Sequence, residues 1–190
     1  DKDENDAIAA LAAAIFSISR VDCDDPVSAW GAHQETLTER QDWLNQKNFH
    51  SLHYKAPGTD FILGLADGHE WKGGASTSMN GISCTPNIPT EEVFTTPHAE
   101  RAEGTVRASK PLVHMGTIID GIEVRFEGGR IVEARAELGE EVFLELIDTD
   151  EGASRLGEAA LVPHSSPISE SGLLFYNTLY DENASCHIAL

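Results

Sequence analysis

Three stretches of the sequence place acidic residues where their neighbours look rigid or buried. Glu91 and Glu92 enter an apolar segment between prolines, Glu158 heads a strand of small and apolar residues, and His187 leads a short apolar strand soon after Glu182. Glutamate is rarely fully buried unless it is paired or bound to a metal. Glutamate and histidine together form a ligand set that suits Zn²⁺, Co²⁺ or Mn²⁺. These residue types indicate a metal site, although their spacing alone is a weak signal.

Each of these residues also has a simpler interpretation. On a strand, Glu91 and Glu92 point to opposite faces, and the local sequence favours one solvated and one salt-bridged glutamate. Glu158 is equally consistent with a solvated strand end. A lone histidine such as His187 is more often a hydrogen-bonded core residue than a ligand. The residues by themselves therefore leave both interpretations open.

The elements that must position these residues follow from the hydrophobic periodicity. Apolar residues at helical spacing predict a helix over 8–18, and Asp25-Pro26 is typical of the start of a second helix, which runs to about Asn45. Gly128-Gly129 between apolar runs indicates a hairpin. Strands are predicted at 51–55, 61–65, 105–107, 117–119, 122–126, 159–162 and 187–190, and helical segments at 139–147, 150–156 and 173–180.

These predictions amount to an α+β fold. We expect N-terminal helices followed by a largely antiparallel, barrel-like sheet with inserted helices.

Composition excludes several classes of partner. The chain has 190 residues with 13 Lys+Arg against 32 Asp+Glu, a net charge of −19. Nucleic acid and anionic membranes require basic clusters, so neither is expected as a partner. Phosphate-binding and dinucleotide-binding glycine motifs, HExxH and GxSxG are missing from the sequence. Three widely spaced cysteines favour a reducing compartment, and hence a cytoplasmic location: Cys23, Cys84 and Cys186.

Longer motifs around these residues resemble the thermophilic-type metalloaminopeptidase family of aminopeptidase T, aminopeptidase S and PepS. The resemblance covers essentially the whole chain. It rests on residues 20–22 (RVD), 25–26 (DP), 57–60 (PGTD), 89–95 (PTEEVFT), 150–153 (DEGA), 156–158 (LGE), 181–184 (DENA) and 187–189 (HIA).

The resemblance implies a two-metal exopeptidase that removes N-terminal residues from peptides with a free N-terminus, as a homodimer. It implies that Glu92, Glu158 and His187 are metal ligands, and it selects Glu92 over Glu91. Glu158 is the candidate to bridge two divalent ions, which are Zn, Co, Mn or Mg. Glu182 is expected beside the site as a further ligand or an acid–base group.

The resemblance also predicts how the chain is divided. Residues 1–46 are expected to be a helical segment that joins to a further N-terminal domain, and residues 47–190 a metal-binding catalytic domain truncated at its C-terminus. The family's catalytic Tyr and a His-x-Asp pair are expected beyond Leu190, so the fragment alone is expected to be inactive.

Two alternatives stay open from the sequence. The first is a non-catalytic acidic binding or regulatory fragment of the same fold. The second is a different metal-dependent hydrolase, such as an amidase or a phosphoesterase. A phosphoesterase should place Arg or Lys near the ligands to hold phosphate, and only Arg155 is close in sequence.

Overall fold

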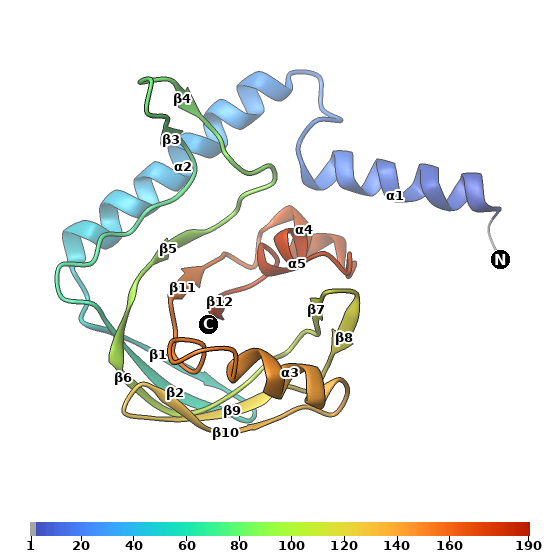
Figure 1. Cartoon of the computed structure of the whole chain (residues 1–190). Helices are drawn as coiled ribbons and strands as arrows, with labels where there is room; N and C mark the ends of the chain where they lie inside the picture. Colours follow the sequence, from blue (N-terminus) through green and yellow to red (C-terminus); the bar gives the residue numbers. More distant parts are fainter. Residues whose placement is uncertain (1–2) are drawn as a thin grey trace.

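Two long helices begin the chain in the computed structural model, which describes residues 3–190 (Figure 1). Helix α1 spans Glu4–Ile18, and helix α2 spans Pro26–Lys47. The Asp25 side chain accepts a hydrogen bond from the Ser28 amide, so it caps α2 as the Asp-Pro pair predicts.

The larger sheet has five antiparallel strands in the order β1-β2-β6-β9-β10. The hairpin predicted at Gly128-Gly129 is confirmed, since β9 pairs with β10 across it, and β1 pairs with β2 in a second hairpin. The strands are β1 (Ser51–Ala56), β2 (Thr59–Leu65), β6 (Pro97–Arg107), β9 (Glu123–Glu127) and β10 (Arg130–Arg135).

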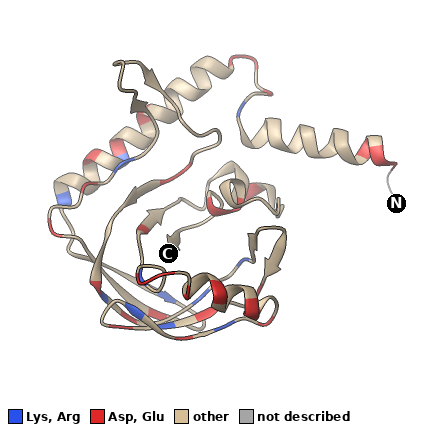
Figure 2. Ribbon diagram, viewed as in Figure 1, with Lys and Arg blue, Asp and Glu red and all other residues tan. Residues whose placement is uncertain are grey.

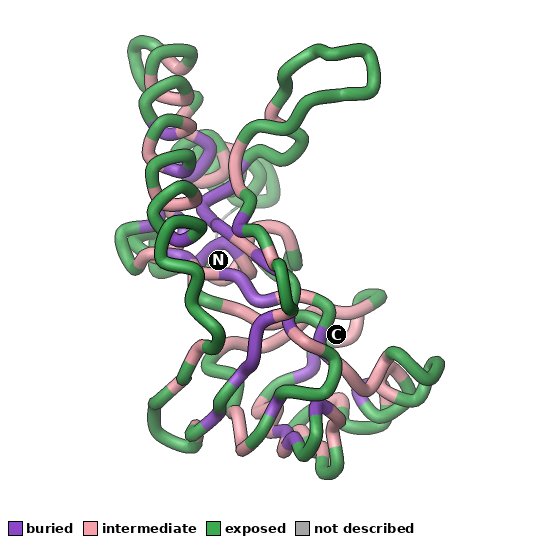
Figure 3. The backbone as a smooth tube through the Cα atoms, turned by 90° about the vertical axis from the view of Figure 1, so that its left-hand side faces the viewer, coloured by how far each residue is buried: buried purple, intermediate pink, exposed green. Residues whose placement is uncertain are grey.

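The smaller sheet has three antiparallel strands in the order β12-β11-β5, and it carries the candidate site. Its strands are β5 (Val93–Thr95), β11 (Glu158–Leu161) and β12 (His187–Ala189). Two short pairs complete the strands, β3 (Ser76–Thr77) with β4 (Ser83–Cys84) and β7 (Leu112–His114) with β8 (Thr117–Ile119). The exposed loop that carries β3 and β4 projects from the body of the molecule (Figure 3).

Three short helices follow the large sheet, namely α3 (Glu140–Ile147), α4 (Pro167–Ser171) and α5 (Thr178–Glu182). The prediction of helix over 150–156 is wrong, because the Asp150 carboxylate accepts from the Gly152 and Ala153 amides and folds the chain into a turn. The prediction over 173–180 holds only from Thr178. The Asp181 carboxylate accepts from the amides before α5, and so holds that segment out of a helix.

Two apolar clusters hold these layers together. Phe61 and Phe126 lie in the first, with ring centroids 5.1 Å apart, between the large sheet and α3. In the second, α2 packs against the strands that lead to the site, and its buried members are Leu37, Leu44, Leu65, Trp71 and Val93. The second helix is thus part of the same packed body as the small sheet.

The α+β class and the antiparallel pairing are confirmed, but the barrel-like closure is not. Across the described residues the large sheet is open, with β1 and β10 as its edges. No hydrogen-bonded ladder in that range joins it to the small sheet. The two sheets instead enclose a common interior (Figure 1).

Acidic residues are spread along the chain, over helices, strands and loops, while basic ones are sparse (Figure 2). Within residues 3–190, no helix has both the length and the hydropathy of a transmembrane span.

Candidate metal centre

Glu92, Glu158 and His187 converge on one face of the small sheet. Glu92 immediately precedes β5, Glu158 is the first residue of β11, and His187 is the first residue of β12. One ligand atom from each of the three lies within 4.8 Å of the other two. Residues as far apart in sequence as 92 and 187 therefore meet at one point.

The strand register explains why the three side chains share a face. His187 pairs with Ala160, which is two residues from Glu158, so the pleat puts both on the same side. Val93 pairs with Leu161. Glu92 lies one residue from Val93 and Glu158 three residues from Leu161, both odd offsets, so Glu92 also falls on that side.

The ligand atoms face one another without hydrogen bonds. His187 Nε2 lies 3.0 Å from Glu92 Oε2 and 3.6 Å from Glu158 Oε1. Glu92 Oε2 and His187 Nε2 are buried, yet neither has a hydrogen-bond partner. A buried polar atom that makes no hydrogen bond is costly, so a cation that both atoms ligate would satisfy them better than they satisfy each other.

The tautomer of His187 follows from its other ring nitrogen. Nδ1 lies 3.1 Å from the Ser185 carbonyl oxygen, which can only accept, so Nδ1 carries the hydrogen. Nε2 then points toward the two carboxylates, where it holds a proton unless a cation displaces it. Burial works to lower the pKa of His187, but the carboxylates of Glu158 and Glu92 outweigh it and raise the pKa to about 10. The site therefore attracts positive charge at Nε2.

A divalent cation fits this arrangement. Metal–ligand bonds of about 2.0–2.2 Å in a tetrahedral shell place donor atoms about 3.3–3.6 Å apart. The separations of 3.0 and 3.6 Å lie close to that range. The Nδ1 hydrogen bond to a backbone carbonyl is also the usual way in which a protein orients a metal-binding imidazole. The donor set of two carboxylates and one imidazole suits Zn²⁺, Co²⁺ or Mn²⁺.

Glu182 lies beside this group without joining it. It ends α5, and its carboxylate is not among the ligand atoms that lie within 4.8 Å of one another. Burial raises the pKa of Glu182, His187 works against this rise, and the carboxylates of Glu92 and Glu158 add to it. The charges of all three residues therefore act on the pKa of Glu182.

The expectation that one of the paired glutamates is solvated is wrong. Glu91 and Glu92 are 2% and 8% exposed. Glu91 does point away from the site, but its carboxylate forms a two-hydrogen-bond ion pair with the Arg20 guanidinium. Local sequence could not reveal this pair, because Arg20 precedes Glu91 by 71 residues.

Arg155 does not supply a phosphate clamp. Its guanidinium donates to the carbonyl oxygens of Ala99 and Gly128, at the hairpin of the large sheet. Arg155 was the one basic residue near the ligands in sequence that could have bound phosphate. Its guanidinium binds backbone carbonyl oxygens instead.

Comparisons with known proteins agree with this geometry. The family model described as thermophilic metalloprotease (M29) matches residues 1–190. Aminopeptidase T of Thermus thermophilus is 56% identical over 98% of this chain and 46% of its own length. Aminopeptidase 2 of Geobacillus stearothermophilus is 53% identical over 100% of this chain and 46% of its own length.

Two solved structures resemble this chain in fold. Wild-type AmpT from Thermus thermophilus superposes with a TM-score of 0.90 at 55% identity, over 97% of this chain and 45% of that one. A 2,5-dihydroxypyridine dioxygenase from Pseudomonas putida shares the fold alone, with a TM-score of 0.53 at 14% identity over 97% of this chain and 63% of that one.

The chain spans about half the length of the curated relatives that it matches. Its match to the family model nevertheless runs from the first residue to the last. The chain belongs to the thermophilic metalloprotease family M29.

Proposed function

We propose that this chain supplies metal ligands to the active site of an aminopeptidase that hydrolyses the first peptide bond of substrates with a free N-terminus. The observation that carries the proposal is the pair of buried atoms that face each other without a hydrogen bond, Glu92 Oε2 and His187 Nε2, with the Glu158 carboxylate beside them. Membership of a metalloprotease family whose relatives are named aminopeptidases supports the reaction class.

The three residues would divide the work by their exposure. Glu92 and His187 are largely buried and would fix the cation, while the Glu158 side chain is 36% exposed. Glu158 therefore has one oxygen free to meet substrate or a second ion, which is the basis for proposing it as a bridge in a two-metal site. A divalent ion held there supplies carbonyl polarisation and a more acidic bound water.

Acidic side chains around the site would recognise the substrate's charged end. We propose Glu182 as a further ligand or acid–base group, because it lies beside the three and is partly buried. A protonated α-amino group is attracted to such a cluster, and an acetylated one is not. Peptides with a free N-terminus are therefore the proposed substrates.

Further parts of the proposal concern the whole protein. It would act as a cytoplasmic homodimer with two divalent ions per site, and the remaining ligands and the catalytic Tyr would come from beyond Leu190. Residues 1–190 alone would then lack part of the metal shell and would not hydrolyse peptides.

The test uses the full-length protein and two matched substrates. Dialysis against a chelator should abolish hydrolysis of leucine p-nitroanilide, and Zn²⁺, Co²⁺ or Mn²⁺ should restore it. N-acetyl-leucine p-nitroanilide should stay intact under every condition. Full activity in the presence of chelator, or equal hydrolysis of the acetylated substrate, would contradict the proposal.

A further inference from the structure

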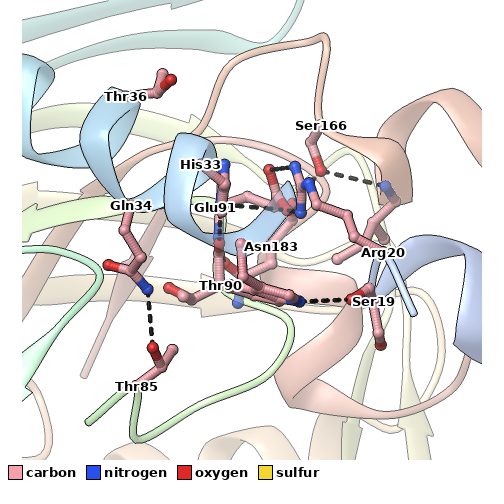
Figure 4. Close-up of polar contacts among 12 residues, drawn as sticks. Ser19, Arg20, His33, Gln34, Thr36, Thr85, Thr90, Glu91, Ser166 and Asn183 are labelled. Atoms are coloured by element: carbon pink, nitrogen blue, oxygen red, sulfur yellow. Dashed lines mark hydrogen bonds and ion pairs between the residues drawn. The ribbon is translucent and has the colours of Figure 1, made fainter. Parts of the chain in front are cut away.

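A buried polar network lies directly behind Glu92, on the side away from the candidate metal centre. Its members are 9% exposed or less, apart from Arg20, whose side chain is 21% exposed. Figure 4 shows them converging from the α1–α2 junction, from α2, from the segment before β5 and from the end of α5. The central members are Arg20, His33, Thr90, Glu91 and Asn183.

The ion pair at the centre is held firmly from the Arg20 side. Arg20 takes a left-handed backbone conformation with φ of 57°, which is unusual for a residue other than glycine. Its guanidinium carbon lies 5.7 Å from the centroid of the Trp30 ring, within cation–π range. The Trp30 indole in turn donates to the Ser19 carbonyl oxygen at 2.9 Å. The Arg20 guanidinium is therefore held by Trp30 as well as by Glu91.

The two residues before Glu92 are fixed by three contacts. The Thr90 carbonyl oxygen accepts from His33 Nε2 at 2.7 Å. The Glu91 amide donates to the Asn183 side-chain oxygen at 2.7 Å, and the Glu91 carboxylate accepts from Arg20 Nη2 at 2.9 Å. Each contact is at least partly shielded from water, which strengthens it.

The chain is held equally closely on the other side of Glu92. A Cβ on Gly73 would lie 2.7 Å from the Glu92 carbonyl oxygen, so the two backbones approach closely only because residue 73 is glycine. Lys72 and Phe94 exchange backbone hydrogen bonds of 2.9 and 2.8 Å. The backbone that carries Glu92 is consequently fixed both before and after it.

The same network reaches Glu182. Asn183 follows Glu182 directly and caps the end of α5, and its side-chain nitrogen donates to the Leu179 carbonyl oxygen at 3.0 Å. Its own carbonyl oxygen accepts from the Ser166 hydroxyl at 2.7 Å. The fully buried Asn183 side chain therefore links the backbone just before Glu92 to the end of α5, directly after Glu182.

We propose that the Arg20–Glu91 ion pair, with Asn183 and His33, is a positioning device that sets the orientation of the Glu92 carboxylate toward the metal. This inference rests on the proposed function, because it assigns the pair a role only if Glu92 is a ligand. None of these four residues is among the three that would hold the metal. They act through Thr90 and Glu91, the two residues that precede Glu92, as partners behind metal ligands generally do.

The test changes the geometry of the Arg20–Glu91 ion pair and keeps its charges. Arg20→Lys retains a cation opposite Glu91 but loses the planar fork that makes two parallel hydrogen bonds. In the full-length protein, titrated with Co²⁺ after chelator treatment, the variant should bind about 10-fold to 100-fold more weakly. The visible absorption bands of bound Co²⁺ should also change, since they report ligand geometry, which a loss of stability alone would not alter.

Two comparisons keep the test decisive. Arg101→Lys makes the same change in the exposed Arg101–Asp67 pair, whose atoms lie 2.8 and 3.4 Å apart, and should leave Co²⁺ affinity and spectrum unchanged. If Arg20→Lys does not fold, the double variant Arg20→Met/Glu91→Met leaves no unpaired buried charge and should show the same loss of affinity. A folded variant of either kind with wild-type affinity and spectrum would overturn the proposal.

Glu92→Gln separates this proposal from the one it rests on. If wild-type protein binds Co²⁺ and Glu92→Gln does not, the metal centre stands whatever the positioning variants show. If wild-type protein and Glu92→Gln bind Co²⁺ equally, Glu92 is not a ligand and both proposals fall.

Discussion

Glu158 is the most exposed of the three converging residues, and this exposure makes it the best position at which to test chemistry apart from folding. Glu158→Gln keeps the shape of the side chain and removes its charge. We expect turnover by the full-length enzyme to fall by about 10²-fold or more, because metal-assisted stabilisation is worth several kcal/mol and each 1.36 kcal/mol is tenfold. Steady-state kcat with leucine p-nitroanilide measures this loss.

Glu145→Gln is the matched control for that variant. Glu145 is an exposed glutamate on α3, away from the three converging residues. Its replacement changes the same charge on the same acidic surface, so kcat should stay within about twofold of wild type, as surface substitutions generally do. An equal loss in both variants would mean that total charge, rather than the site, sets the rate.

The residue types at the site could be predicted from sequence, but their partners could not. Glu92, Glu158 and His187 stand out as polar residues that lead apolar strands, and the family resemblance separates Glu92 from Glu91. The ion pair of Glu91 with Arg20 was missed, because it joins residues 71 apart whose meeting depends on how α1 and α2 are packed. The only available signal was that Arg20 and Asn183 lie within the motifs that carry the resemblance.

At the scale of elements, the glycine hairpin between β9 and β10 shows which turn positions tolerate a side chain. Gly128 and Gly129 have φ of 55° and 78°, both in the left-handed region. A Cβ on Gly128 meets nothing within 4 Å, whereas one on Gly129 would lie 2.0 Å from the Ala99 carbonyl oxygen. The second position is therefore closed by the backbone of β6 as well as by its conformation.

This difference predicts unequal costs for the same substitution. Gly128→Ala should lower the free energy of unfolding by about 1–2 kcal/mol, the cost of a left-handed alanine. Gly129→Ala should lower it by about 3 kcal/mol or more, because overpacking against backbone adds to that cost. Urea unfolding of the two variants in the full-length protein measures both values, and equal losses would show that β6 does not approach the turn as closely as the structure has it.

The attachment of α2 to the segment before β5 predicts a dependence of stability on pH. Burial lowers the pKa of His33, while the Thr90 carbonyl and Glu91 raise it and Arg20 and Arg40 lower it. The unfolded chain therefore takes up a proton near pH 6.5 that the folded chain refuses. Stability that is fully present above that pH should be lost as the pH falls below it.

The His33→Gln variant isolates this effect. Glutamine can still donate to the Thr90 carbonyl but does not titrate. Between pH 8 and pH 5.5, the urea midpoint of wild-type full-length protein should fall further than that of His33→Gln. Parallel pH profiles for the two proteins would show that His33 takes up its proton equally well when folded.

The predictions of helices, strands and turns were confirmed where they depend on neighbouring residues, and they failed where contacts between distant residues decide the structure. The Asp-Pro helix start, the Gly128-Gly129 hairpin and the polar first residues of β11 and β12 each depend on a few neighbouring residues. The order β12-β11-β5, which brings the site together, depends on contacts between distant segments. The helix predicted over 173–180 was cut short by Asp181, whose carboxylate binds the amides before α5 in place of a helical carbonyl.

At the scale of the whole molecule, a metal at the candidate centre would connect segments that the backbone leaves far apart. Glu92, Glu158 and His187 come from three strands of one sheet, and unfolding would separate them. A cation that binds only the folded chain stabilises it by about 2.7 kcal/mol at a concentration 100-fold above its dissociation constant. We therefore expect Zn²⁺ or Co²⁺ to raise the Tm of metal-free full-length protein.

Glu92→Gln and His187→Gln should lose most of this rise. Glu151→Gln, at a position whose side chain is 94% exposed, should keep it. A control with NaCl at the same ionic strength measures how much of any rise in Tm comes from screening of the −19 net charge. A Tm that rises equally in all four proteins would place the bound cation on the acidic surface instead of the proposed centre.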